Sequence, residues 1–330
     1  MKNNILIDRH GRTISYLRLS VTDRCNFRCQ YCMPEKGIDF VSRSELLTYE
    51  ELLYLSEIFC QLGITKIRVT GGEPFVRKDI TSFLHTLRKI DGLEKLAITS
   101  NGTILQKHID ELKEIGIDSI NISLDSLDKE RFYQITRRDQ FDKVYSGIVK
   151  LLDAGFKVKV NCVVMDGKNE EDIIPFIELT KNYPISVRFL EEMPFNGSHS
   201  FNTIKWDYRT IYNYIHEHYK QIEKVSAKPA STSVNYQIPG YTGTFGIIAS
   251  FSRTFCGTCN RIRLSAIGDL RTCLYGPPVA NLRDLLRMNV SKDQLEMAII
   301  NAVRMREKDG HAAEDQNKKN ILESMSILGG

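Results

Sequence analysis

The sequence predicts an α/β fold, in which a partial and open (βα)6 barrel is followed by a C-terminal lobe that closes the open side. From residue 16 to about residue 190, short β-branched runs alternate with longer runs of helical periodicity, which is typical of βα units and a parallel sheet. Six units are too few for a complete eightfold TIM barrel. The alternation ends after Pro194. We therefore divide the chain into a barrel domain, residues 1–195, and a lobe, residues 196–330.

The expected strands and helices follow from local patterns. Six strands are expected over residues 16–21, 66–70, 95–99, 119–124, 157–164 and 186–190. The helix after the first strand is the best defined, because Thr48 and Glu51 form a capping-box pattern and Gly63 follows as a C-cap. Gly155 ends a second helix over 141–154 in the same way. The lobe is expected to contain a helix over 207–219 and strands around 246–251 and 262–265.

Composition and charge exclude several classes of protein. Of the 330 residues, 42% are hydrophobic and 26% are charged, which is ordinary for a globular chain. No apolar run reaches the roughly 18 residues of a membrane span, and the first residues lack a secretory signal, so we expect a cytoplasmic protein with no membrane partner. A formal charge of +4 is too small to indicate a nucleic acid partner. It is consistent with a local positive patch that binds an anionic small molecule. Eight cysteines in the reducing cytosol indicate metal binding or catalysis.

Three cysteines follow the first expected strand in a C-x3-C-x2-C pattern: Cys25, Cys29 and Cys32. Three thiolates on one loop can bind three irons of a 4Fe–4S cluster and leave the fourth iron open. A structural zinc is the alternative, but zinc prefers four ligands, and neither a histidine nor a fourth cysteine lies near this loop. The spacing therefore favours a cluster with one open iron.

This cysteine loop resembles the loop that defines the radical S-adenosylmethionine (SAM) superfamily, in which an aromatic residue, here Tyr31, precedes the last cysteine. The resemblance implies a partial barrel of the radical SAM type. It also implies that the amino and carboxylate groups of SAM bind the open iron. One electron then cleaves SAM and yields a 5′-deoxyadenosyl radical, which the protein must hold against a single C–H bond.

A Gly-Gly-Glu-Pro segment at residues 71–74 directly follows the second expected strand, at the rim of the barrel where ligands bind. A plain turn is the alternative, but the position after a strand and beside the cysteine loop favours contact with SAM. The superfamily resemblance implies four SAM contacts: Tyr31, Gly72, Ser123 and Met193. Without that resemblance, Met193 would be assigned to core packing.

A second group of three cysteines lies near the C-terminal end: Cys256, Cys259 and Cys273. A zinc site completed by a distant histidine such as His199 is the alternative. Because no fourth ligand is adjacent, we favour a second 4Fe–4S cluster with an open iron. The two remaining cysteines fall within an expected helix and an expected strand, and are assigned to the core: Cys60 and Cys162.

Arg261 and Arg263 follow the second cysteine pair two residues apart, so on a strand they point to the same side. Guanidinium groups form paired hydrogen bonds with phosphate oxygens, and an arginine cluster beside an open iron would suit a triphosphate. A solvated strand face is the alternative explanation for this pair.

The two cysteine groups, the Arg-x-Arg pair and the Gly-Gly terminus together resemble the superfamily branch that acts in molybdenum-cofactor biosynthesis, over essentially the whole chain. The resemblance implies a lyase that joins C3′ of the ribose of GTP to C8 of its guanine. It implies catalytic roles for Arg261, Arg263, Gly329 and Gly330. The GTP contacts that it implies are Arg18, Arg68, Thr99, Lys159, Arg261, Ile262 and Arg263.

The same resemblance implies three protein partners: an electron donor such as flavodoxin or ferredoxin, the next pathway enzyme, cyclic pyranopterin monophosphate synthase, and a second copy in a homodimer. Two other functions stay open. One is a radical SAM enzyme that modifies or activates a peptide with an auxiliary cluster, against which the Arg-x-Arg pair and the Gly-Gly end argue. The other is a non-catalytic zinc or RNA-binding protein, which the iron content would distinguish.

Overall fold

The computed structural model describes residues 5–195, 204–226, 229–317 and 324–328. The first six strands match the predicted bounds to within one residue. They are β1 (Tyr16–Ser20), β2 (Lys66–Thr70), β3 (Lys95–Ser100), β4 (Ser119–Ser123), β5 (Val158–Val164) and β6 (Ser186–Glu191). Each pairs in parallel with the next. All six carboxyl ends therefore lie at one rim, and the predicted partial barrel is confirmed.

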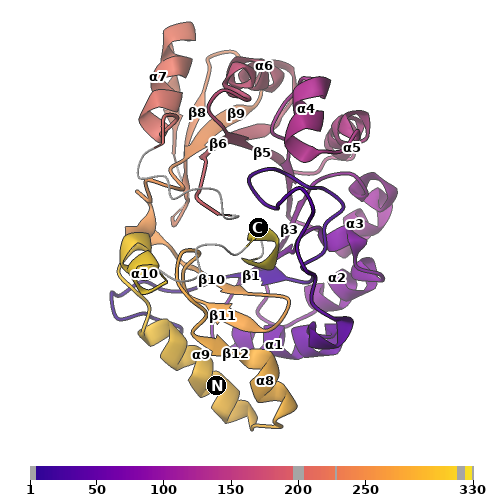
Figure 1. The fold of residues 1–330 in the computed structure, drawn as a ribbon, viewed down its shortest axis with the longest axis vertical. Helices are drawn as coiled ribbons and strands as arrows, with labels where there is room; N and C mark the ends of the chain where they lie inside the picture. Colours follow the sequence, from indigo (N-terminus) through magenta and orange to yellow (C-terminus); the bar gives the residue numbers. More distant parts are fainter. Residues whose placement is uncertain (1–4, 196–203, 227–228, 318–323, 329–330) are drawn as a thin grey trace.

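The sheet forms an open ring, and helices cover the outer side of these six strands (Figure 1). They are α1 (Tyr49–Gln61), α2 (Ile80–Arg88), α3 (Ile109–Ile115), α4 (Lys129–Thr136), α5 (Phe141–Asp153) and α6 (Ile173–Asn182). The predicted capping box of α1 is present, since the side chain of Thr48 accepts the backbone N–H of Glu51 and the side chain of Glu51 accepts that of Thr48. Gly63 follows with a φ of +97°, and Gly155 follows α5 with a φ of +82°, a conformation that glycine adopts without strain.

The residues after β6 extend the same sheet at both edges. They form α7 (Tyr208–His218), β7 (Glu223–Val225), β8 (Ser233–Gln237), β9 (Thr244–Ile248), β10 (Arg261–Leu264), β11 (Asp269–Arg271) and β12 (Ala280–Asn281). The strand order is β12-β11-β10-β1-β2-β3-β4-β5-β6-β9-β8-β7. β9 is parallel to β6 and β10 is parallel to β1. The C-terminal segment is thus continuous with the barrel sheet, which the sequence pattern did not reveal because each strand's partner is distant in the chain.

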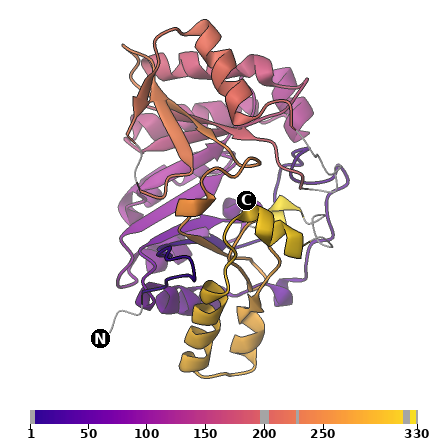
Figure 2. The ribbon, with the colours of Figure 1, turned by 90° about the vertical axis from the view of Figure 1, so that its left-hand side faces the viewer.

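The remaining helices follow β12. α8 (Leu282–Arg287) and α9 (Lys292–Arg304) extend as a pair beyond the rest of the molecule (Figure 2), whereas α10 (Gly310–Gln316) and the short α11 (Met325–Leu328) return toward the ring. Over the described ranges, no helix has the length and apolar character that crossing a membrane requires.

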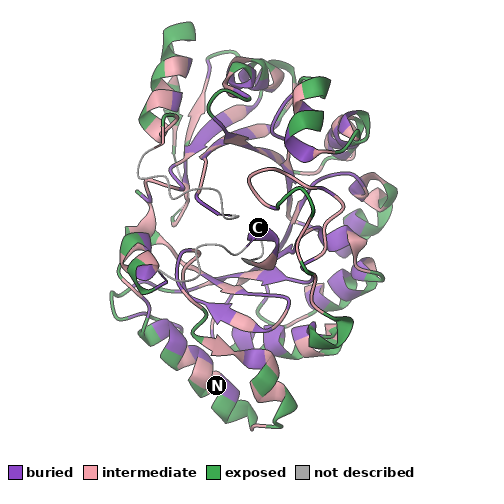
Figure 3. Ribbon diagram, viewed as in Figure 1, coloured by how far each residue is buried: buried purple, intermediate pink, exposed green. Residues whose placement is uncertain are grey.

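The hydrophobic core lies between the strands and the surrounding helices, whose outer faces are exposed (Figure 3). In β1, Leu17 and Leu19 are fully buried in this core, while Arg18 between them faces the interior of the ring, as the alternation of strand side chains requires. Cys60 and Cys162 are both buried in the core, as predicted. The interior of the ring therefore contains charged and polar side chains beside some apolar ones.

Candidate functional site

The interior of the ring contains a cavity of about 770 Å³. Its walls include side chains from each of the strands β1 to β6 and from the C-terminal segment. All six cysteines predicted as metal ligands line it: Cys25, Cys29, Cys32, Cys256, Cys259 and Cys273. The fold therefore brings two cysteine groups from opposite ends of the sequence to one cavity.

The first cysteine group lies on the loop that follows β1. The carbonyl of Cys29 accepts hydrogen bonds from the backbone N–H groups of Cys32 and Met33, at 3.0 and 2.9 Å. The guanidinium of Arg28 donates to the carbonyl of Cys25 at 2.8 Å. These bonds shape the loop so that its three half-buried thiols face the cavity.

Gly71 and Gly72 let the end of β2 approach the backbone that leads into this loop. The N–H of Gly72 donates to the carbonyl of Thr22 at 2.7 Å, and the N–H of Glu73 donates to that of Arg24 at 2.8 Å. A Cβ atom on Gly72 would lie only 2.4 Å from the Arg24 carbonyl oxygen. The close approach that requires glycine here is thus to the protein's own backbone, although both glycines also line the cavity.

Tyr31 is fixed by a carboxylate just after the end of β4. Its hydroxyl donates to Oδ2 of Asp125 at 2.9 Å, and Asp125 also accepts the N–H of Val163 at 2.9 Å. Burial raises the pKa of Asp125 to about 6, although these two bonds lower it. Asp125 was not predicted, and its position just after β4 was the signal available. All four predicted SAM contacts line the cavity: Tyr31, Gly72, Ser123 and Met193.

The second cysteine group begins in a short 3-10 turn, η5 (Cys256–Thr258). The N–H of Cys259 donates to the carbonyl of Cys256 at 3.2 Å, and Arg306 donates to the carbonyl of Cys259 at 2.8 Å. Burial raises the pKa of Cys259, but the charges of Arg306 and Arg261 outweigh it and hold the pKa below its usual value. Such electropositive surroundings favour a thiolate, which is the form that binds metals.

A small apolar cluster joins the two cysteine loops. It consists of Phe195, Tyr275 and Met325. Cys32 and Cys273 both pack against it, and the hydroxyl of Ser324 donates to the carbonyl of Cys32 at 2.6 Å. Helix α11 thus lies beside the two loops, near the centre of the ring (Figure 1). Gly329 and Gly330, predicted to act in catalysis, lie outside the described residues.

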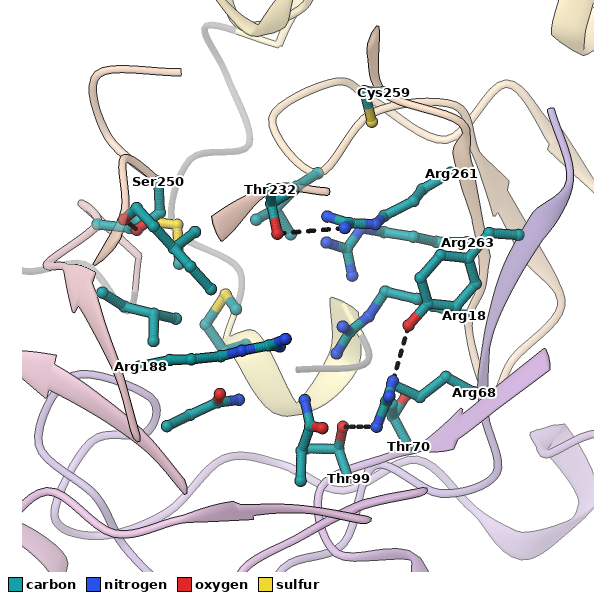
Figure 4. A pocket seen from close by; sticks show the side chains of 18 of the residues that line it. Arg18, Arg68, Thr70, Thr99, Arg188, Thr232, Ser250, Cys259, Arg261 and Arg263 are labelled. Atoms are coloured by element: carbon teal, nitrogen blue, oxygen red, sulfur yellow. Dashed lines mark hydrogen bonds between the residues drawn. The ribbon is translucent and has the colours of Figure 1, made fainter. Parts of the chain in front are cut away.

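Four arginines form a lateral row across neighbouring strands, and three of them line the cavity: Arg18, Arg68 and Arg263. Arg271 of β11 is paired with Arg263 of β10, and Arg263 is paired with Arg18 of β1. Arg18 is in turn paired with Arg68 of β2. Like charges directly opposite each other destabilise a sheet, so this row indicates a site for an anion. Figure 4 shows the side chains that point into the cavity from two sides: Arg18, Arg188, Arg261 and Arg263.

Burial and mutual repulsion make these positive charges unfavourable without an anion. Burial, then the charge of Arg261, lowers the pKa of Arg263 to about 10. Burial, then the charge of Arg68, lowers the pKa of Arg188 to about 10. The pKa of Lys159 falls to about 7, because of burial and then the charge of Arg188. A bound polyanion would offset both causes.

Tyr16 is a cavity residue that the sequence did not predict. Its hydroxyl accepts a hydrogen bond from Nε of Arg68 at 2.7 Å, and Nζ of Lys66 lies 4.3 Å from its ring centroid. Burial raises its pKa, but the charges of Arg68 and Arg18 outweigh it and lower the pKa to about 6. Its cationic neighbours come from β1 itself, β2 and β10, so nothing local distinguishes it from an ordinary strand aromatic.

Two predicted GTP contacts differ from the others. Arg68 lines the cavity but is only 3% exposed, and its guanidinium already donates to the carbonyl of Ile98 at 2.6 Å. The prediction for Ile262 needs correction: its side chain is fully buried in the core, because it faces the opposite side of β10 from Arg261 and Arg263. The other predicted contacts line the cavity: Arg18, Thr99, Lys159, Arg261 and Arg263.

The cysteine groups fit iron–sulfur clusters better than zinc. Within the part of the chain that the structure describes, no three His, Cys, Asp or Glu side chains are grouped to hold one metal ion. A structural zinc needs four ligands about 2.0–2.3 Å from one point, whereas each thiolate of a 4Fe–4S cluster ligates a different iron. Burial is the main cause that raises the pKa of Cys25 to about 11 and that of Cys32 to about 12. A bound cation would therefore be needed to hold these thiols as thiolates. His199 lies outside the described residues.

The sequence matches two families in adjoining segments, and both agree with this geometry. Residues 19–180 match the Radical SAM superfamily, and residues 185–312 match Molybdenum Cofactor Synthesis C. A crystal structure of SuiB from Streptococcus suis bound to S-adenosylmethionine has a TM-score of 0.62 and covers 98% of this chain and 72% of that chain. Its sequence is only 14% identical, so this likeness concerns the fold alone.

Relatives at higher identity are known for the whole chain. Molybdenum cofactor biosynthesis protein 1 of Dictyostelium discoideum is 41% identical over 99% of this chain, which spans only 52% of that protein. The chain likewise spans about half the length of several other curated relatives that it matches. The mitochondrial GTP 3′,8-cyclase of Arabidopsis thaliana is 42% identical over 99% of this chain and 84% of that protein. The chain therefore belongs to the radical SAM superfamily and, within it, to the GTP 3′,8-cyclase family.

Proposed function

We propose that this chain is a radical SAM lyase that converts GTP to (8S)-3′,8-cyclo-7,8-dihydroguanosine 5′-triphosphate in molybdenum-cofactor biosynthesis. One observation carries the proposal: two groups of three cysteines and three arginines of the lateral row, Arg18, Arg68 and Arg263, line the same cavity. A substrate within it can contact both cysteine groups and the cations at once. This arrangement suits a small anionic substrate better than a peptide, and it has no evident use in a structural zinc protein.

In the proposed division of the chain, residues 1–195 hold the first cluster and SAM, and residues 196–330 hold the second cluster. Tyr31, Gly72, Ser123 and Met193 would contact SAM at the carboxyl rim of the strands. When bound, the first cluster supplies the electron that cleaves SAM to methionine and a 5′-deoxyadenosyl radical. Tyr31 would keep the first loop in position through its bond to Asp125.

The cations of the cavity would bind the triphosphate and so orient the nucleotide. Arg18, Arg261 and Arg263 come from adjacent strands, while Lys159 and Arg188 come from the adjacent strands β5 and β6. If its phosphates are bound between these two groups of cations, the ribose and the base of the nucleotide would extend toward the two cysteine loops. Enclosure by the ring would exclude other C–H bonds and water from the radical.

The proposed reaction balances as follows. The 5′-deoxyadenosyl radical takes the hydrogen atom from C3′ of GTP and leaves as 5′-deoxyadenosine. The carbon radical at C3′ forms a bond to C8 of guanine, and one electron and one proton complete the 7,8-dihydro product. Flavodoxin or ferredoxin would supply the electrons. The homodimer and the transfer of product to cyclic pyranopterin monophosphate synthase belong to the same proposal.

An anaerobic assay tests this function. The reconstituted protein is incubated with SAM, dithionite and either GTP or ATP, and 5′-deoxyadenosine and the cyclised nucleotide are measured. We expect about eight irons per chain and product with GTP only. Equal release of 5′-deoxyadenosine with both nucleotides, or zinc in place of iron, would contradict the proposal.

We expect GTP binding to be coupled to proton uptake near neutral pH. Burial and the charge of Arg188 lower the pKa of Lys159 to about 7, and a bound triphosphate would raise it again. Between these two pKa values binding takes up a proton, so affinity falls as the pH rises above about 7. Titration calorimetry without SAM, in buffers of different ionisation enthalpy, measures this uptake.

The matched variant for this measurement is Lys159→Arg, whose side chain stays charged at every pH in the range. Its proton uptake is expected to be smaller than that of the unmodified protein. Tyr16, whose pKa is lowered to about 6, would take up protons in the same direction and accounts for any remainder. Equal uptake by Lys159→Arg and the unmodified chain would show that Lys159 does not titrate on binding.

A further inference from the structure

A buried charged cluster contacts the backbone of the second cysteine loop, and none of its members was predicted. Asp8, Arg12 and Arg306 form it, and they are only 4%, 9% and 4% exposed. Asp8 and Arg12 belong to an N-terminal turn closed by a bridge between Ile7 and Thr13, whereas Arg306 follows α9. We call these three residues the Asp8–Arg12–Arg306 clamp.

One carboxylate oxygen holds both arginines of the clamp. Nε of Arg12 lies 2.6 Å from Oδ2 of Asp8, and a guanidinium nitrogen of Arg306 lies 3.8 Å from the same oxygen. The other carboxylate oxygen accepts the backbone N–H groups of His10 and Arg12 at 2.9 and 3.0 Å. Asp8 is therefore fixed by its own turn before it orients the arginines.

Each arginine in turn holds the backbone of a cysteine. Arg12 donates to the carbonyl of Cys256 at 3.0 Å, and Arg306 donates to the carbonyl of Cys259 at 2.8 Å. Arg12 also donates to the carbonyls of Lys308 and Glu307, each at 2.6 Å. Both ends of the C-x2-C turn are thus tied through arginines to a single carboxylate.

Stability alone is a weak reason for this arrangement. Burying three charges costs desolvation energy that a well-packed apolar cluster would avoid, and each arginine bonds the backbone of one of the two cysteines in the C-x2-C turn. Arginine is suited to this role because its planar fork directs N–H groups from three nitrogens to separate carbonyls, whereas lysine has a single nitrogen without that fixed geometry. Both arginines also line the cavity.

We propose that Asp8, Arg12 and Arg306 are positioning residues that fix the second cluster, through the backbone of Cys256 and Cys259, relative to the bound nucleotide. The inference rests on the proposed function, because it requires a cluster on the second cysteine group. Groups that hold metal ligands in place change affinity or activity by about 10- to 100-fold when they are removed. Nearby charges and hydrogen bonds also set the electronic properties of a cluster.

The test uses the full chain carrying Cys29→Ala, so that only the second cluster gives a signal. In this background Arg12→Lys keeps the charge but loses the fork, and Asp8→Asn is a milder second variant. The readouts are iron per chain and the electron paramagnetic resonance spectrum of the reduced cluster, with and without GTP. The KM for GTP is measured separately in chains that retain Cys29.

We expect Arg12→Lys to alter the spectrum and its response to GTP, and to raise the KM by about 10-fold or more, with Asp8→Asn changing both in the same direction. The matched control is Arg287→Ala, which removes an ion pair to Glu51 at 2.9 Å from a side chain that is 38% exposed and that bonds neither a cysteine nor a clamp residue. Arg287→Ala should leave the spectrum and the iron content unchanged.

The remaining outcomes distinguish the clamp from the proposed function. An unchanged spectrum, GTP response and KM in both variants overturns the clamp. In chains that retain Cys29, selective loss of the second cluster supports it, whereas equal loss of both clusters shows a general role in folding and overturns it. If the unmodified chain itself holds only about four irons, the proposed function fails, whatever the clamp variants show.

Discussion

Replacing Cys29 with alanine is expected to abolish SAM cleavage completely. Cys29 is the middle one of the three proposed ligands in the first loop, and only two thiols would remain there to hold a cluster that leaves one iron open for SAM. The carbonyl of Cys29 would still accept the N–H groups of Cys32 and Met33, so the backbone of the loop should survive the change. The loss is then a loss of the cluster and not of the fold.

Two measurements check the effect of Cys29→Ala. Iron should fall from about eight to about four per chain, and 5′-deoxyadenosine should fall to background under reducing conditions. Cys60→Ala is the matched control, because Cys60 is buried in α1 away from the cavity residues; it should keep both the iron and the activity. Formation of 5′-deoxyadenosine by Cys29→Ala at the level of the unmodified chain would show that the first cluster is wrongly assigned.

Replacing Arg263 with alanine is expected to lower turnover of GTP by about 10- to 100-fold, the effect of losing one charged hydrogen bond worth about 1.5–3 kcal/mol. Arg263 is an inner member of the lateral row, with Arg18 on one side and Arg271 on the other. The iron content of the Arg263→Ala protein should be unchanged, because no cysteine is altered. A lysine at this position should restore part of the activity, since it keeps the charge but not the fork.

The same substitution is expected to leave the protein without GTP as stable as before, or more stable. Burial, and then the charge of Arg263, lowers the pKa of Arg18 across the strand pair, so removing Arg263 relieves repulsion. Thermal unfolding of the apoprotein measures this effect. Arg287→Ala, which removes an exposed ion pair between α8 and Glu51, is the control and should keep full turnover. A marked fall in the unfolding temperature of Arg263→Ala would show that the row is structural.

The parts of the fold that could be predicted are those written in local patterns. The six strands of the barrel follow from short apolar runs, and α1 follows from its capping box and its terminal glycine, because these signals involve residues close together in the chain. The six cysteines that line the cavity could also be named as candidate ligands from the sequence, since ligand spacing on a loop is a local property. The same holds for Cys60 and Cys162, whose positions within a helix and a strand indicated burial.

The pairing of strands was not predictable in this way. β10 pairs with β1 and β9 pairs with β6, although the segments that pair lie far apart in the chain. The register of these strand pairs places arginines from distant segments side by side. The alternation of side chains within β10 points Ile262 away from the cavity. The same reason applies to Tyr16 and Asp125, whose partners come from other strands.

By itself, the sequence determined which segments form the barrel and indicated six cysteines as candidate metal ligands, because thiolate chemistry, helix capping and strand periodicity act over a few neighbouring residues. The tertiary structure alone decided that the two cysteine groups share one cavity, that four arginines stand side by side, and that Asp8, Arg12 and Arg306 hold the second loop. Those are contacts between distant parts of the chain, and they form when burial of the common core brings the strands together.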